Sequence, residues 1–251
     1  MSDDAVLISS QAGPPIGWIP DGPSLVAPDR KISAFDSVAG RSSIRQFLGQ
    51  EVPESVVYKI LETASRAPSG QNMQPWMVHY VTGDTRARLC DEVKAAASAD
   101  ERSDEYEYFP REIKEPYRSR RRKVGFDLFD IYGIERNDVA GRKRALLRNF
   151  DFFDAPVGLF FVMERDWGYG AWIDMGNFMT NVMTLAPAFG LQTCPQQAWC
   201  EYGAAVRRVL PITDHHVIIS GMALGYADPQ APVNRLVTQR DSPEAFVTRY
   251  I

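Results

Sequence analysis

The sequence contains little cysteine and little histidine, with three of each in 251 residues. The cysteines are too few and too widely spaced for a disulfide framework, so we expect a reducing, cytoplasmic location. No cysteine or histidine spacing suits a metal ion, and we expect no metal site. A Gly-x-Ser-x-Gly turn and a phosphate-binding Gly-Lys-Ser/Thr loop are also missing, so the sequence offers neither of those catalytic motifs.

Long apolar runs are missing as well. A membrane span needs about 20 apolar residues, whereas the strongest run here, Val157 to Met163, has the length of a strand. The N-terminus lacks a basic start followed by an apolar run, so we expect no signal peptide and no membrane association. The formal net charge of −4 gives no general field that would attract nucleic acid. Any cationic binding site must therefore be local.

What is present is an ordinary globular composition, with 45% hydrophobic and 24% charged residues. Residues 1–30 carry five prolines and no periodic pattern, which predicts an irregular N-terminal arm. No repeat or linker divides the remainder, so residues 31–251 are expected to form one α+β domain in which helices surround a small sheet.

The apolar patterns predict the following elements. Helices are expected from near Ile32, with Asp29 or Ser33 leading in, from Pro53, and over 84–97, 142–150, 172–189 and 201–210; strands are expected over 76–81, 157–164 and 216–224. Pro187 should kink the long helix and Gly190 should end it. Residues 100–141 are the least regular section, and 229–251 form an extended tail.

Two arginines, Arg41 and Arg45, stand four residues apart with Ser42 and Ser43 between them. On a helix this spacing puts both guanidinium groups on one face, where they can bind a phosphate or another anion. An isolated Arg-x-x-x-Arg pair is, however, more often a solvated helix face.

A second block, Pro68-Ser-Gly-Gln-Asn72, is followed by Gln74-Pro-Trp76. Its small, amide and proline residues turn the chain sharply and leave backbone donors free. Taken alone, such a block is an ordinary helix-to-strand connection. The two blocks in this order and at this separation resemble the FMN-dependent nitroreductase family.

The resemblance covers about residues 35–240 and adds two later motifs, Cys194-Pro-Gln-Gln-Ala-Trp199 and Asn234-Arg235. It implies a nitroreductase-like fold, with a central mixed sheet flanked by helices and extended terminal arms, assembled as a homodimer. Residues 116–133 and 148–156 look like a subset that acts on nitroaromatic compounds.

The resemblance also implies which residues bind FMN. They are Arg41, Ser42, Ser43, Arg45, Pro68, Ser69, Gly70, Asn72, Gln74, Pro195, Gln196, Gln197, Asn234 and Arg235. Arg41 and Arg235 would hold the phosphate with support from Ser43, and Arg45 would lie beside the pyrimidine edge of the flavin. The loop from Pro68 would belong to the partner subunit, so that the two chains share each active site.

No catalytic side chain is certain; the backbone near Gln196 and Gln197 would face flavin N5. Several relatives carry Glu-Gly where this sequence has Gln197-Ala198, so a carboxylate role is not expected. The alternative interpretation of this motif is a helix-exit loop with a buried cysteine.

The segment 100–141 would be a variable region on the substrate side of the flavin. Its aromatic residues Tyr117, Phe126 and Phe129 are candidates to stack on a flat substrate. The basic run Arg118 to Lys123 either binds the extra phosphate of NADPH or an acidic substrate, or forms a solvated helix face.

The implied reaction is ping-pong. NADH or NADPH reduces FMN and leaves, and a nitroaromatic compound then accepts electron pairs to give nitroso and hydroxylamino products. Two alternatives remain open. One is a reductive dehalogenase or ene-type reductase on the same scaffold, and the other is a flavin-binding protein without catalysis.

Overall fold

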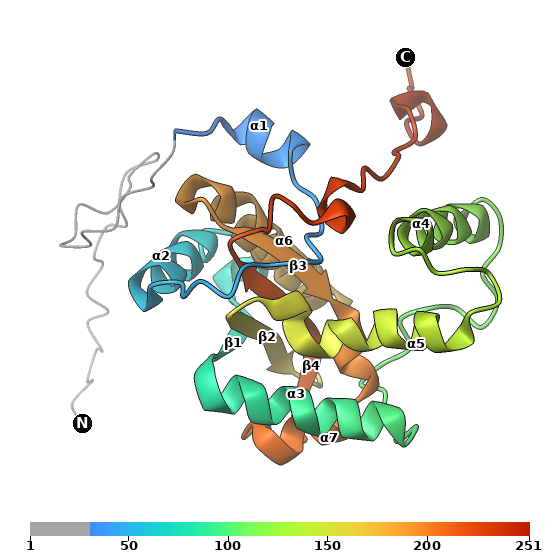
Figure 1. The fold of residues 1–251 in the computed structure, drawn as a ribbon. Coiled ribbons are helices and arrows are strands. Elements are labelled where there is room, and N and C mark those ends of the chain that lie inside the picture. The colour runs from blue at the N-terminus through green and yellow to red at the C-terminus, as the bar shows by residue number, and fades with distance from the viewer. Residues whose placement is uncertain (1–30) are drawn as a thin grey trace, which may run out of the picture.

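The computed structural model describes residues 31–251, so the predicted N-terminal arm lies outside the described part. A four-stranded sheet forms the centre, in the order β1-β2-β4-β3 (Figure 1). The strands are β1 (Met77–Val81), β2 (Val157–Glu164), β3 (Gln192–Gln196) and β4 (His216–Gly225). All three pairings are antiparallel. Within the described residues the sheet is therefore antiparallel, and the expectation of a mixed sheet is wrong.

The central strand β2 sends its side chains alternately into two apolar cores. Phe160 and Val162 pack with α3 (Gly83–Ser98) and α7 (Gly203–Val209), whereas Leu159 and Phe161 pack with α2 (Glu54–Ala64) and α6 (Tyr169–Leu185). A strand covered on both faces must be apolar at successive positions, which is why this run is so clear in the sequence. The strand bounds of β2 are those predicted.

Most of the predicted helices are confirmed with small shifts of their ends. Helix α1 (Ala34–Ala39) begins after Ser33, whose hydroxyl accepts a hydrogen bond from the backbone of Asp36 at 3.0 Å. Helix α6 ends at Leu185, and the chain continues as a 3₁₀ turn, η3 (Ala186–Phe189). Gly190 then adopts a left-handed φ of 72°, as its predicted stop role requires.

Three elements differ from the predictions. The irregular section contains a 15-residue helix, α4 (Tyr117–Ile131), which has no buried residue and therefore no apolar periodicity to reveal it. Helix α5 (Val139–Leu147) starts earlier than predicted and passes into η2 (Arg148–Asp154). Strand β3 replaces the expected loop after the long helix; it is a short edge strand that contains a proline.

A tight packing contact supports the turn after β3. Trp199, in η4 (Gln197–Glu201), is fully buried, and a Cβ atom on Gly221 of β4 would lie 2.4 Å from its indole ring. Trp199 also stacks on Phe152, with ring centroids 4.4 Å apart. Only glycine lets the indole approach the sheet this closely, and this contact fixes the start of η4.

The chain ends in two short turns, η5 (Pro232–Arg235) and η6 (Pro243–Ala245). Helix α4 and this C-terminal segment project from the body on the same side (Figure 1). Among the described residues, no helix has the length and apolar content needed to cross a bilayer.

Candidate active site

The segment that carries Arg41 and Arg45 is extended rather than helical. Helix α1 ends at Ala39, and Ile44 donates its backbone N–H to Thr193 of β3 at 3.1 Å. Leu48 likewise donates to Tyr226, just after β4, at 2.8 Å. Because these hydrogen bonds join distant parts of the chain and none lies within a helix, the four-residue spacing does not put the two arginines on one helix face. The two guanidinium groups are placed by the sheet and not by a helix face.

Asn234 holds this segment in place. Its side-chain oxygen accepts the backbone N–H groups of Arg45 and Gln46 at 2.8 and 3.1 Å. Its amide nitrogen donates to the backbone oxygens of Gln46 and Asp228 at 2.7 and 3.0 Å. An asparagine side chain has two donor hydrogens and two acceptor lone pairs, and all four are used. Asn234 thus positions Arg45 and has no free amide atom for direct cofactor contact.

A second contact fixes the same segment from the other side. The side chain of Gln46 accepts from Arg148 at 2.7 Å and donates to Asp154 at 2.7 Å, and Arg148 also pairs with Asp154 at 3.0 Å. Burial acts to raise the pKa of the Asp154 carboxyl, but the hydrogen bonds from Arg148 and Gln46 outweigh it and hold that pKa below its ordinary value.

The buried thiol of Cys194 in β3 marks where the predicted residues converge. Burial raises the pKa of this thiol to about 11, while the charge of Arg45, a hydrogen bond from Ser43 and the charge of Arg41 act in the opposite direction. The structure therefore brings Arg41, Ser43 and Arg45 to the strand that carries Pro195 and Gln196.

Beside this strand lies an open groove, which we call the central groove. One part, of about 740 Å³, is lined by Arg45, Gln197 and residues of 102–111. The adjoining part, of about 800 Å³, runs along one face of α6 and is lined by Pro195 and Trp172. Tyr106, Glu107, Tyr108 and Gln197 line both parts. Aromatic side chains and arginines thus surround the backbone that follows β3.

The aromatic wall of the groove is anchored by Glu105, whose side chain is 3% exposed. Its carboxylate pairs with Arg207 and, at 2.7 Å, with Arg165. The next residue, Tyr106, donates its hydroxyl to the backbone oxygen of Ile219 and packs edge-on against Trp172 at 4.8 Å. Burial raises the pKa of Tyr106, so its hydroxyl remains protonated and keeps this bond.

The two glutamines at the end of β3 play different parts. The side chain of Gln196 is buried; it donates to the backbone of Asn149 at 2.7 Å and accepts from Trp199 at 3.3 Å. Its side chain is therefore occupied, and only its backbone remains for the predicted role. Gln197 lines both parts of the central groove.

The loop from Pro68 to Gln74 is placed elsewhere. Gly70 donates to Asp174 of α6 at 3.1 Å, and Gln74 donates its backbone N–H to the Ser69 hydroxyl at 3.1 Å. Gln71, Asn72 and Gln74 have positive φ, and their side chains are exposed. Loop residues do not line the described central groove. A single chain therefore does not bring the two predicted halves of the site together.

The remaining predicted residues lie around the projecting segments. Arg235 is exposed at the end of η5, next to Asn234. Tyr117 lines a cavity between α4 and the C-terminal segment. Phe126 and Phe129 line a neighbouring cavity beside α4, and they do not line the central groove itself. Their role in substrate binding remains a prediction.

Sequence reasoning missed the residues that form the aromatic wall. Tyr106 and Tyr108 were visible only as aromatics among charges, and Trp172 matched the apolar pattern of a core helix. One signal was available for Trp172: it lies at the start of the predicted helix, at the edge of the apolar pattern, where a side chain can face a groove and not the core. Pairing of 102–106 with η4 and α7 could not be foreseen, because it depends on contacts between residues about 100 positions apart.

Comparison with known proteins agrees with this geometry. The model of the nitroreductase family matches residues 38–226. A chloronitrobenzene nitroreductase of Comamonas testosteroni is 39% identical over 215 residues, which are 85% of this chain and 95% of the relative. A 4-nitrobenzoate reductase of Pseudomonas putida is 35% identical over 213 residues, covering 84% of this chain and 93% of the relative.

Solved structures agree as well. The FMN- and NADPH-dependent nitroreductase NfnB from Sphigopyxis sp. strain HMH superposes with a TM-score of 0.85 at 38% identity, over 87% of this chain and 99% of that one. NfnB from Mycobacterium smegmatis, solved in complex with NADPH, gives a TM-score of 0.83 at 28% identity, over 87% and 97%. The chain belongs to the nitroreductase family, and the predicted family and nitroreductase-like α+β fold are confirmed.

Proposed function

We propose that this chain is an FMN-dependent, NAD(P)H-oxidising nitroreductase that reduces nitroaromatic compounds. The central observation is that Arg45, fixed by Asn234, lines the same aromatic groove as Gln197. Relatives that match over most of their length are named for the reduction of chloronitrobenzene and 4-nitrobenzoate, and NfnB is described as FMN- and NADPH-dependent. Together these support both the cofactor and the substrate class.

The residues present fit FMN. Arg41, Arg45 and Arg235 have no carboxylate within ion-pair distance among residues 31–251, so their guanidinium groups are available to an external anion. Arg41 and Arg235 would hold the phosphate, with Ser42 and Ser43 supporting it. Arg45 would favour negative charge at the pyrimidine edge. The backbone at Pro195, Gln196 and Gln197 would face the redox-active edge.

When bound, FMN would supply the redox chemistry, namely acceptance of a hydride and transfer of an electron pair. The protein's own contribution is geometry and charge. Tyr106, Tyr108 and Trp172 form flat walls against which an aromatic ring can lie. The ion pairs of the buried Glu105 with Arg165 and Arg207 hold the chain next to Tyr106 in place.

We propose that the active site is completed by a second copy of the chain. Loop 68–74 is exposed, and Pro68, Ser69, Gly70, Asn72 and Gln74 would contact the flavin of the partner subunit. Large apolar side chains near this surface support a homodimer. Tyr169 and Ile173 of α6 are 90% and 66% exposed, and Phe35 of α1 is 79% exposed. Such exposure is unusual for a monomer and typical of an interface.

The test of the proposed function is anaerobic reduction of the FMN-loaded protein by NADPH or NADH, followed by addition of chloronitrobenzene, nitrobenzene or 4-nitrobenzoate. Bleaching of the flavin and its reoxidation by a nitroarene, with hydroxylamino product, would support the proposal. Reoxidation only by halogenated phenols would instead favour the dehalogenase alternative. Bound flavin that neither donor reduces would indicate a non-catalytic flavoprotein.

All three cysteines are free, which suits the proposed cytoplasmic location.

A further inference from the structure

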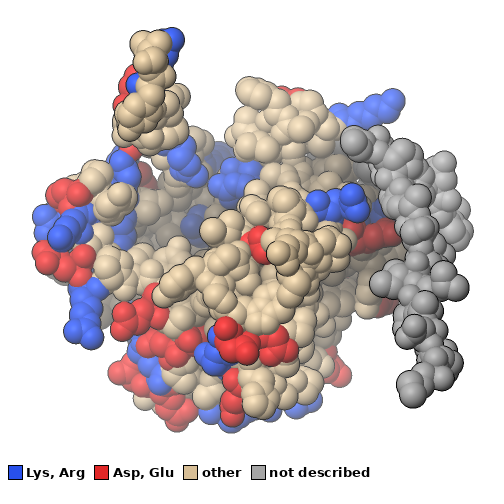
Figure 2. All heavy atoms as spheres, turned by 180° about the vertical axis from the view of Figure 1, so that it is seen from behind, with Lys and Arg blue, Asp and Glu red and all other residues tan. Residues whose placement is uncertain are grey.

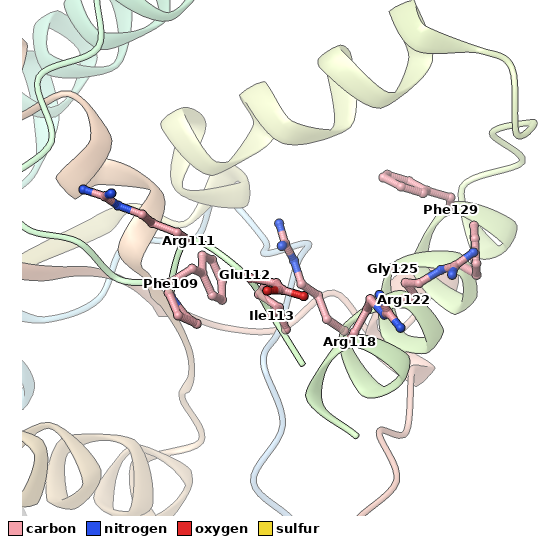
Figure 3. Close-up of a pocket in the computed structure, with 11 residues that line it drawn as sticks. Phe109, Arg111, Glu112, Ile113, Arg118, Arg122, Gly125 and Phe129 are labelled. Carbon is pink, nitrogen blue, oxygen red and sulfur yellow. The ribbon is translucent and has the colours of Figure 1, made fainter. Parts of the chain in front are cut away.

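A second cavity, of about 540 Å³, lies between residues 109–113 and α4; we call it the arginine pocket. Figure 3 shows Phe109, Arg111 and Glu112 of the loop on one side and Arg118, Arg122 and Phe129 of α4 on the other. Four arginines and one glutamate line it, in a chain whose net charge is −4. The pocket is therefore a local concentration of positive charge.

The basic residues that line the arginine pocket differ from the other basic residues of α4 in their ion pairing. Arg120 pairs with Asp241, and Lys123 pairs with Asp127 at 2.8 Å; both point away from the pocket. Arg111, Arg121 and Arg122, which line the pocket, have no carboxylate partner in the part of the chain that the structure describes. Three guanidinium groups thus lack an internal counter-ion where one cavity brings them together.

Aromatic rings lie beside two of these groups. The guanidinium of Arg121 lies 4.6 Å above the ring of Phe109, and that of Arg122 lies 6.0 Å from the ring of Phe126. Stacking uses the face of a guanidinium group and leaves its in-plane N–H donors free. Such donors match the oxygens of a phosphate, and the flat ring surfaces beside them match a nucleobase.

The arginine pocket is continuous with the central groove, because Phe109 and Arg111 line both. A ligand that extends from Gln197 to Arg121 must be long, with a reactive ring at one end and an anion at the other. Figure 2 shows basic side chains around a hollow between the body of the molecule and the projecting segments, which lie at the left in that view.

We propose that the arginine pocket binds the adenosine 2′-phosphate end of NADPH, and that Arg121 and Arg122 make the chain prefer NADPH to NADH. This inference rests on the proposed function, since the nicotinamide would occupy the central groove. A small nitroarene carboxylate is the less suitable occupant, because Arg121 and Arg122 line only the arginine pocket, whereas Gln197 lines only the central groove.

The direct test is binding of adenosine fragments to the FMN-loaded protein by calorimetry. Adenosine 2′,5′-bisphosphate is expected to bind about tenfold more tightly than adenosine 5′-monophosphate, as for a charged contact worth about 1.4 kcal/mol. In the double variant Arg121→Gln/Arg122→Gln the two fragments should bind equally. The matched control Arg120→Gln removes one charge from the same helix outside the pocket and should keep the preference.

Steady-state kinetics give a second measurement. The double variant should raise KM for NADPH about tenfold and leave KM for NADH and for the nitroarene unchanged. The proposal would be overturned if the double variant raised the KM for NADPH and the KM for NADH equally, or if it changed only the KM for 4-nitrobenzoate. It would also be overturned if the unmodified protein showed no preference for the fragment with a 2′-phosphate. If the protein reduced no nitroarene, the proposed function would fail, yet the fragment titration would still decide whether the pocket recognises the 2′-phosphate.

Discussion

Asn234 acts through the backbone it binds. Its amide joins two backbone segments beside the central groove, one at Arg45 and Gln46 and the other at Asp228. Family resemblance predicted this residue as a cofactor ligand, whereas the structure places it one step behind Arg45. Residues of this kind can be found from a motif, but their role follows only from the contacts.

We predict that Asn234→Ala weakens FMN binding and lowers the free energy of unfolding by about 1–3 kcal/mol, because buried backbone groups lose their partners. Flavin titration and denaturant unfolding of the apoprotein measure the two effects. Gln239→Ala, in the exposed tail, is the matched control and should change neither. Unaltered flavin affinity in Asn234→Ala would show that Arg45 does not depend on this clamp.

The three thiols are predicted to be unreactive in the native protein. Burial raises the pKa of Cys90 and Cys194 to about 11 and that of Cys200 to about 12. The thiolate is the reactive form, so at about pH 8 only a very small fraction can react. A disulfide reagent should label no cysteine rapidly before denaturation and all three afterwards. Rapid native labelling of Cys194 would contradict its placement in β3.

Whether a helix or strand could be predicted from the sequence depended on what that element packs against. Strand β2 and helix α2 show their apolar patterns because both are covered by a core. Helix α4 buries nothing in the described chain, and β3 is a five-residue edge strand, so neither leaves a pattern. The same holds for the site. Its motifs could be recognised in the sequence, whereas the aromatic wall could not be predicted, because it depends on the pairing of residues 102–106 with distant residues.

The contact between β4 and η4 provides a test at this scale. Gly221→Ala would place a Cβ atom 2.4 Å from Trp199 in a filled core, and we expect the free energy of unfolding to fall by about 1–3 kcal/mol. The control is Gly49→Ala, where no atom lies within 4 Å of the added carbon. Equal unfolding midpoints for the two variants would mean that Trp199 does not pack as described.

At the scale of the whole molecule, the separation of loop 68–74 from the central groove argues for two chains per site. Ile173→Asp places a charge on the exposed apolar face of α6, so we predict a monomer with greatly reduced flavin binding. Val139→Asp, on the comparably exposed start of α5, should remain a dimer with normal flavin. Light scattering gives the mass. A monomeric Ile173→Asp that still reduces nitroarenes would refute the shared site.

The shared flavin site is tested by size-exclusion chromatography with light scattering and flavin absorbance recorded together. For the unmodified protein we predict a dimer that carries one FMN per chain, and for Arg41→Ala a dimer with most of its flavin lost. Full flavin in Arg41→Ala would remove that residue from the phosphate site. Flavin that co-elutes with a monomer, or a protein that takes up no FMN at all, would contradict an FMN site shared between two chains.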